Sequence, residues 1–210
     1  MSHRSVTPGI ELSPDIAAFF RDVLHETKKK QRFETTDAAE TYVVALLADF
    51  ARPDQLSGRT FDRPITFLLV EAMQSVGKER FERLRTLGDG VLFVSGFFGD
   101  HLQTRGVELR YVSSVGARAY EGAASMLRRG SSVPRASTSA HDLFGELADN
   151  FSMFVDLLSG MADALLARSV HGERGLLRLY EKWLKTGSPL LADALAVRGM
   201  CAKRGDGVLH

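Results

Sequence analysis

The chain has 210 residues, of which 44% are hydrophobic and 25% are charged, so length and composition predict one soluble globular domain or at most two. Its formal net charge of +1 argues against a general binder of nucleic acid, and its single cysteine excludes an intramolecular disulfide and a multi-cysteine zinc site. No secretory leader opens the chain, and its longest nearly apolar run, residues 90–99, is half of the roughly 20 residues that a membrane-spanning helix needs, so we expect a cytoplasmic protein with no membrane partner.

Apolar residues recur at the helical period along almost the whole chain. Residues 1–12 are polar and broken by proline and glycine, which predicts a flexible N-terminal segment. A first helix is predicted over residues 13–30 and a second over 37–50, in which Asp37 is the expected N-cap because a glutamate follows three residues later. A third helix is predicted over residues 64–75.

The fourth predicted helix, residues 77–104, contains four glycines between positions 88 and 99. Each glycine in a helix interior costs about 1 kcal/mol relative to alanine, so these need a reason: close approach of a neighbouring helix, a bend, or room for a ligand. The fifth predicted helix, residues 107–129, is also thin, since glycines and alanines lie among its apolar positions. Joined at Gly106, the two helices are expected to form a closely packed antiparallel hairpin at the centre of the fold.

Residues 129–138 have the composition of a loop and form the one expected internal boundary. A sixth helix is predicted over residues 140–168 and a seventh over 176–187, followed by a short eighth that starts with Ser-Pro. Residues 201–210 are expected to be a flexible tail. With no alternating strand pattern and no repeat, the prediction is a single all-α domain over residues 13–200, a bundle of seven or eight helices.

The arrangement of chemically active residue types points away from catalysis. Asp89 and Asp100 fall on one stripe of the fourth helix about 16 Å apart, too far for a paired acid and base. The glycine spacing is not that of a phosphate-binding loop, no Glu-x-x-His pair suggests a metal, and Ser95 lacks the glycine two positions earlier that a nucleophile elbow requires. We therefore expect no catalytic residue, no metal and no cofactor.

A glycine-rich bent helix covers the haem in haem oxygenases, whose first helix supplies a histidine ligand. Leu87-Gly88-Asp89 and Ser95-Gly96 resemble the pattern of that covering helix, and His25 lies on the first predicted helix. The resemblance implies a haem-type ligand against residues 88–99. The Ser-Gly pair lies farther from Leu-Gly-Asp, and His25 lies nearer to Gly88, than the pattern of that family requires.

Two hypotheses about function follow, a protein-interaction hypothesis and a ligand-binding hypothesis. The ligand-binding hypothesis, which includes the haem-type ligand, places a flat or elongated small molecule against the glycine-rich helix. The residues expected to orient it are Asp89, Ser95, Gly96, Asp100, His101, Tyr111 and Tyr120.

The protein-interaction hypothesis, which we favour, rests on the pattern of charged residues. Residues 136–167 contain five acids and no lysine or arginine, and the acids step by four, three, seven and seven, which predicts one acidic face on the sixth helix. This face is either merely solvated or docks a basic protein partner or a second copy of the chain. The five residues are Asp142, Glu146, Asp149, Asp156 and Asp163.

We therefore predict a non-catalytic helical interaction or regulatory protein that acts through protein contacts, including self-association. The basic cluster at residues 28–32 is of ordinary size and is followed by a single aromatic, so nucleic-acid binding is not expected. The excess of arginine over lysine and the abundance of alanine and glycine indicate a bacterial genome.

Overall fold

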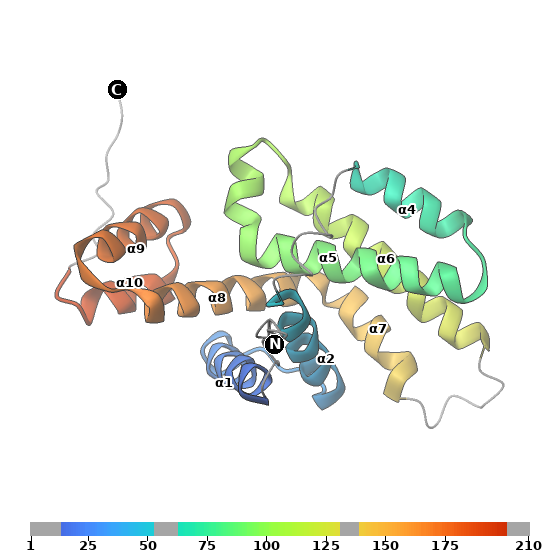
Figure 1. Ribbon diagram of the computed structural model, residues 1–210, viewed down its shortest axis with the longest axis horizontal. Coiled ribbons are helices and arrows are strands. Elements are labelled where there is room, and N and C mark those ends of the chain that lie inside the picture. Colours follow the sequence, from blue (N-terminus) through green and yellow to red (C-terminus); the bar gives the residue numbers. More distant parts are fainter. Residues whose placement is uncertain (1–13, 53–62, 131–138, 201–210) are drawn as a thin grey trace, which may run out of the picture.

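The computed structural model describes residues 14–52, 63–130 and 139–200, and the side chains of residues 16–52, 63–129 and 143–200. These residues form α-helices and no strand, which confirms the all-α class (Figure 1). The predicted N-terminal segment, most of the predicted loop at 129–138 and the predicted C-terminal tail lie outside the described residues. The helices are α1 Pro14–Gln31, α2 Asp37–Phe50, α4 Ile65–Gln74, α5 Gly77–Thr104, α6 Leu109–Gly130, α7 Ser139–Asp149, α8 Phe151–Ser169, α9 Gly172–Thr186 and α10 Pro189–Ala196.

The start of α2 differs by one residue from the prediction. Thr36, with extended backbone angles (φ −70°, ψ 153°), is the N-cap, and its side-chain oxygen accepts a hydrogen bond from the backbone N–H of Ala39 at 3.3 Å. Asp37 is therefore the first residue of the helix and not its cap. It still lies at the positive end of the helix dipole, where an acidic side chain is favourable.

α5 and α6 pack along one another, with α4 on one side of the pair and α7 on the other (Figure 1). Glycines lie at this contact: a Cβ placed on Gly88 would come within 2.6 Å of the Tyr120 ring, and one on Gly122 would lie 3.0 Å from Leu84. The missing side chains therefore allow close approach. α5 also bends, since Phe98 leaves helical geometry (φ −125°, ψ 19°) close to Gly96 and Gly99.

The sixth predicted helix is wrong as a single element, because the described part of this region is two helices, α7 and α8. They meet at an angle of 83°, and Asn150 between them has φ −107° and ψ 23°. Both the backbone N–H and the side-chain amide of Asn150 donate to the carbonyl oxygen of Glu146, at 3.0 and 3.3 Å. This break raises the number of helices among the described residues to nine, one more than the largest number predicted.

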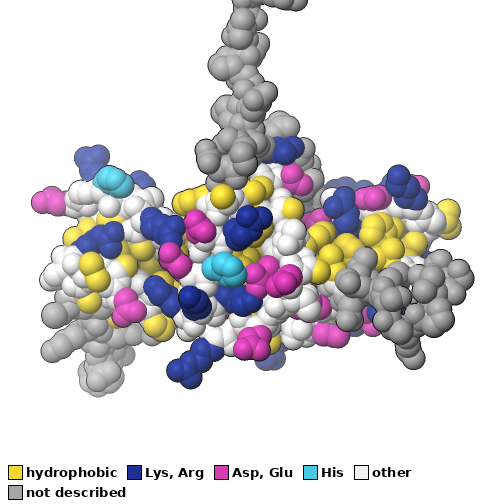
Figure 2. Space-filling model, turned by 90° about the horizontal axis from the view of Figure 1, so that it is seen from below, with side chains coloured by type: hydrophobic (Ala, Val, Ile, Leu, Met, Phe, Trp, Pro, Cys, Tyr) yellow, Lys and Arg dark blue, Asp and Glu magenta, His cyan; other side chains and the backbone are white. Residues whose placement is uncertain are grey.

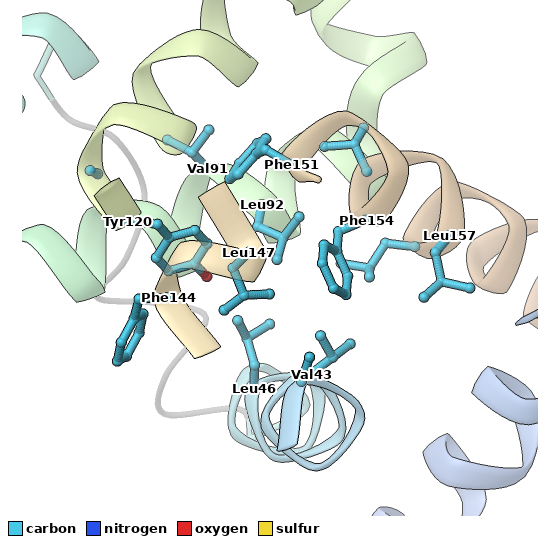
Figure 3. Close-up of a cluster of buried hydrophobic side chains, with 14 of the residues drawn as sticks. Val43, Leu46, Val91, Leu92, Tyr120, Phe144, Leu147, Phe151, Phe154 and Leu157 are labelled. Carbon is cyan, nitrogen blue, oxygen red and sulfur yellow. The ribbon is translucent and has the colours of Figure 1, made fainter. Parts of the chain in front are cut away.

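The larger hydrophobic core lies where α2, α5, α6, α7 and α8 converge (Figure 3). Side chains of α2 point toward Leu147 of α7 and Phe154 of α8, and Tyr120 of α6 closes the other side of the cluster. Phe154 also meets Phe33 edge-to-face, with ring centroids 5.1 Å apart. Because α7 and α8 both contribute apolar side chains to this one cluster, the apolar period continues in the sequence across their break.

A second, smaller core lies at the end of the molecule formed by α9 and α10 (Figure 1). Its buried members are Leu179, Trp183, Leu191 and Leu195. They pack against the C-terminal part of α8, so that α8 belongs to both cores.

Within the described ranges, no single helix has the length and hydropathy needed to cross a membrane. α7 and α8 satisfy that test only when taken together across their bend.

Candidate functional site

Asp89 lies in a buried polar cluster that joins three helices. The hydroxyls of Tyr42 on α2 and Tyr120 on α6 donate hydrogen bonds to its Oδ1 at 2.7 and 2.8 Å. Nη1 of Arg85, one turn earlier on α5, lies 3.8 Å from Oδ2. Burial, followed by the charge of Asp89, raises the pKa of both tyrosine hydroxyls, which keeps them protonated as donors.

This cluster has the features of a structural network. Tyr120 is fully buried and Asp89 is 7% exposed, so a molecule in solution has little access to the carboxylate. Tyr42 was not among the predicted site residues, because a tyrosine on the apolar stripe of a helix gives no sequence signal of its partner.

Ser95 and Gly96 face α8. A Cβ placed on Gly96 would lie 2.3 Å from the Cβ of Leu158, and Ser95 is 1% exposed. The Ser95 hydroxyl makes no hydrogen bond within the described part of the chain. A ligand against this stretch would have to displace Leu158, just as one against Gly88 would have to displace Tyr120.

The other three predicted ligand residues point elsewhere. Asp100 and His101 are exposed at the C-terminal end of α5, and Tyr111 is exposed at the start of α6, where its hydroxyl donates to Thr66 Oγ1 at 3.4 Å. The structure therefore brings Asp89 and Tyr120 together but does not gather the seven predicted residues around one space.

The residues that resemble the haem-oxygenase pattern do not fit a haem. The His25 side chain is 61% exposed on α1, with Nδ1 3.9 Å from a carboxylate oxygen of Glu40. The space against Gly88 and Gly96 is filled by protein side chains. Among the described residues, no group of three histidine, cysteine or acidic side chains is placed to hold a metal ion.

Two of the predicted acidic residues are used inside the protein. Glu146 of α7 accepts hydrogen bonds from the hydroxyls of Thr35 and Thr36, both at 2.5 Å, and from the backbone N–H of Thr36 at 2.9 Å. Burial raises its pKa, but these bonds and the charge of Lys28 outweigh burial, so that the pKa of Glu146 is lowered. Asp163 is buried, with Oδ1 2.8 Å from Nζ of Lys182 on α9.

The remaining acids do not form the single face that a continuous helix predicted. Asp149 and Asp156 are exposed, on α7 and α8, and neither makes an ion pair within the described residues. The side chain of Asp142 lies outside the described residues.

Asp149 and Asp156 line a groove of about 510 Å³ between α6 and the α7–α8 bend. Its floor is apolar and includes the buried side chains of Phe151 and Val155. The α6 side carries Arg110 and two serines, whereas both acids lie on the opposite side. Burial raises the pKa of Asp156.

A second, more polar cleft of about 430 Å³ separates the α9–α10 end from the rest of the molecule. Lys30 and Asp100 lie on the side of the larger core, and Lys185 lies on the α9 side. Asp156 and Asp163 of α8 also line this cleft, so two of the five residues of the predicted acidic face lie here together with Asp100, a predicted ligand residue.

The face of the molecule on which α1 lies carries basic and acidic side chains interleaved across its centre (Figure 2). Two ion pairs involve residues of α1: Lys28 pairs with Glu40, and Glu26 pairs with Arg168 of α8 at 2.7 Å. This face therefore presents no broad field of one sign.

Comparison of the chain with protein family models, with curated proteins and with solved structures finds no match.

Proposed function

We propose that this protein is a non-catalytic bacterial cytoplasmic interaction module that binds a helix of a partner protein in the groove between α6 and α8. The observation that carries the proposal is an apolar floor with Asp149 and Asp156 along one side, neither of which forms an ion pair with any residue that the structure describes. An apolar groove between two helices suits an amphipathic helix, and unpaired acids at its rim favour a basic one. We also propose that the bundle is built around a glycine-rich hairpin of α5 and α6. The close contacts of Gly88 with Tyr120 and of Gly122 with Leu84 support this arrangement.

The groove also predicts the charge pattern of the partner helix. The edge that lies along α7 and α8 should carry lysine or arginine, whereas the edge along α6 should carry an acid opposite Arg110. The apolar edge between them would pack on the half-buried apolar side chains that line the groove, Leu109, Ala117 and Ala148. This pattern separates the proposed partner from nucleic acid, whose negatively charged phosphates would be repelled by Asp149 and Asp156.

Site-specific photo-crosslinking in the native host tests the proposal. A photoreactive residue at Ser113, inside the groove, should crosslink to one protein, whereas one at Met153, which is exposed on α8 outside the groove, should not. The crosslinked segment, made as a synthetic peptide, should bind the purified protein. Binding should fall at least tenfold in the Asp149→Lys, Asp156→Lys double variant.

Charge reversal in the peptide supplies the control. A peptide whose basic residues are replaced by glutamate should recover binding to the double variant and lose binding to the wild-type protein. Equal crosslinking from Ser113 and Met153, or peptide binding that ignores both reversals, would show that the groove is not the docking site.

A second candidate function is binding of a small polar molecule in the cleft between α8 and the α9–α10 end. The volume of about 430 Å³ lies in the range of small-molecule sites, and both charge signs line the cleft. A native mass spectrum of the protein purified from its own host decides this point. A reproducible added mass that disappears in Lys185→Glu supports the cleft, and a bare polypeptide mass argues against it.

A further inference from the structure

α9 offers positive charge and apolar surface together on its outer side. Its inner side packs on α10 and on the C-terminal part of α8, with Leu179 and Trp183 buried. On the outer side, Leu177 is 57% exposed. Arg174 and Arg178 are also exposed, and neither forms an ion pair with any residue that the structure describes. α9 lies at one end of the molecule, beyond the larger core (Figure 1).

The exposed residues of α9 are sorted by charge around the helix. At 3.6 residues per turn, their order from one edge of the outer side to the other is Glu173, Leu184, Leu177, Glu181, Arg174, Lys185 and Arg178. One edge therefore ends in an acid, the leucines follow, and the other edge carries three bases against one acid. Lys185 lines the cleft of its own chain, whereas Arg174 and Arg178 do not.

The groove between α6 and α8 has the complementary order. Asp149 and Asp156 lie on one side of it, apolar side chains line it, and Arg110 lies on the α6 side. With Leu177 on the apolar lining, the basic edge of α9 runs along the two acids, and Glu173 lies on the side of Arg110. Reversing the direction of α9 in the groove would exchange its edges and place like charges together, so the match fixes one direction.

A chain cannot place α9 in its own groove. The groove lies at the N-terminal part of α8, where Phe151 and Val155 belong to its floor. The α9–α10 end packs on the C-terminal part of α8, where Leu166 and Ala167 contact the smaller core. The helix between Val155 and Ala167 is about 18 Å long. The occupant must therefore come from another molecule.

We infer that the groove between α6 and α8 receives α9 of a second copy of this chain. The inference rests on the proposed function of the groove and names its partner. Because the groove and α9 are different surfaces, each assembly is left with one open groove and one open α9 at its ends. Association therefore continues past the dimer as the protein concentration rises, and it weakens as salt screens the charges at the rim.

Two variants, each with one half of the contact reversed in charge, test the inference. Arg174→Glu, Arg178→Glu changes α9, and Asp149→Lys, Asp156→Lys changes the groove, and all four side chains are exposed. In sedimentation at low salt, the mass of the wild-type protein should rise from 23.1 kDa past twice that value, whereas each variant alone should stay at 23.1 kDa. An equimolar mixture of the two variants should associate like the wild type, because every α9 then meets a groove of opposite charge.

Arg21→Glu, Lys29→Glu on α1 is the matched control, since it reverses two exposed bases and gives the same net charge as the α9 variant. This control should associate like the wild type. The inference is overturned by a wild-type protein that stays monomeric, by an α9 variant that associates normally, or by a mixture that stays monomeric.

The photo-crosslink from Ser113 separates failure of this inference from failure of the proposed function. If α9 of a second copy is the occupant, the crosslinked peptide lies within residues 172–186 of this same chain. A crosslink to a different protein overturns the inference and leaves the groove as a docking site. Equal crosslinking from Ser113 and Met153 removes the groove itself, and the inference fails with it.

Discussion

The carboxylate of Asp89 accepts hydrogen bonds from tyrosines on two other helices, and both tyrosines must keep their protons to donate them. In the unfolded chain a tyrosine ionises near pH 10. In the folded protein burial and the charge of Asp89 raise the pKa of Tyr42 and Tyr120 above that value. The stabilisation is therefore complete below pH 10 and is lost as the pH rises, because the unfolded state alone releases these protons.

We predict two effects of Tyr42→Phe. At neutral pH the free energy of unfolding should fall by about 1.5–3 kcal/mol, because a hydrogen bond to a charged group is lost. Above pH 10 stability should decline less steeply than in the wild type, by about 1.4 kcal/mol per pH unit. Urea unfolding from neutral to strongly alkaline pH measures both, and parallel curves for the two proteins would contradict the raised pKa of Tyr42.

Gly96 and Gly99 provide a matched pair for the role of the glycines in α5. A Cβ on Gly96 would lie 2.3 Å from the Leu158 Cβ, whereas one on Gly99 would meet Leu109 at an ordinary 3.5 Å. Gly96→Ala should lower the free energy of unfolding by about 1–3 kcal/mol through overpacking. Gly99→Ala should leave it unchanged or raise it by up to about 1 kcal/mol through better helix propensity. Chemical denaturation of both proteins checks this, and a stable Gly96→Ala protein would mean that α8 can move away.

The predicted ligand residues show why part of the site could not be found from the sequence. Glycine spacing in α5 was informative, since it marked both the close approach at Gly88 and the bend at Phe98. The partners of those glycines, Tyr120 and Leu158, lie on other helices, and no local pattern identifies them. A glycine in the sequence indicates that something lies close to the helix at that position. Only the packing of the folded chain shows that it is a protein side chain and not a ligand.

Helix boundaries followed closely from local rules, because caps, prolines and glycines act within one turn. α5 begins and ends at the predicted residues 77 and 104, and α2 covers the predicted 37–50. The break at Asn150 was missed, since one asparagine interrupts an apolar period that both α7 and α8 continue into the same core. The period of apolar residues predicts which side of a helix is buried. It does not predict the 83° change of direction between the axes of α7 and α8.

Glu146 connects two helices end to side, because its carboxylate on α7 binds the backbone and hydroxyl at the N-cap of α2. The stabilisation from its lowered pKa is present at neutral pH and is lost as the pH falls through the folded pKa. We predict that Glu146→Gln lowers the free energy of unfolding by about 1–2 kcal/mol at neutral pH, allowing for partial solvent screening.

The Glu146→Gln protein should also lose less stability than the wild type on acidification. Asp149→Asn, three residues further along α7, is the control and should change neither quantity, since the exposed Asp149 side chain makes no hydrogen bond or ion pair within the described residues. Acid unfolding followed by circular dichroism measures the difference. Identical acid profiles for Glu146→Gln and the wild type would remove Glu146 as the link between α7 and α2.

Across the whole molecule, the two hydrophobic cores are unequal and share α8. The larger core draws on helices from α1 to α8, whereas the core of α9 and α10 has four buried side chains. Polar ties across the boundary include Lys182 to Asp163 and the guanidinium of Arg198, which donates to the carbonyl oxygen of Ala167 at 2.6 Å. With less buried apolar surface, the α9–α10 end should open at a lower free energy than α5 and α6.

Native-state hydrogen exchange can separate these two levels of stability. The backbone amides of α9 and α10 should exchange through a local opening, while those of α5 and α6 should exchange only on global unfolding. Lys182→Met sharpens the test, because it leaves the buried Asp163 carboxylate unpaired, at a cost of about 3–5 kcal/mol. That cost should appear first as lost protection in α9 and α10. Adding Asp163→Asn should restore most of it, since the uncompensated charge is then gone. If the amides of α9 and α10 instead exchange at the same free energy as those of α5, the two cores unfold as one cooperative unit.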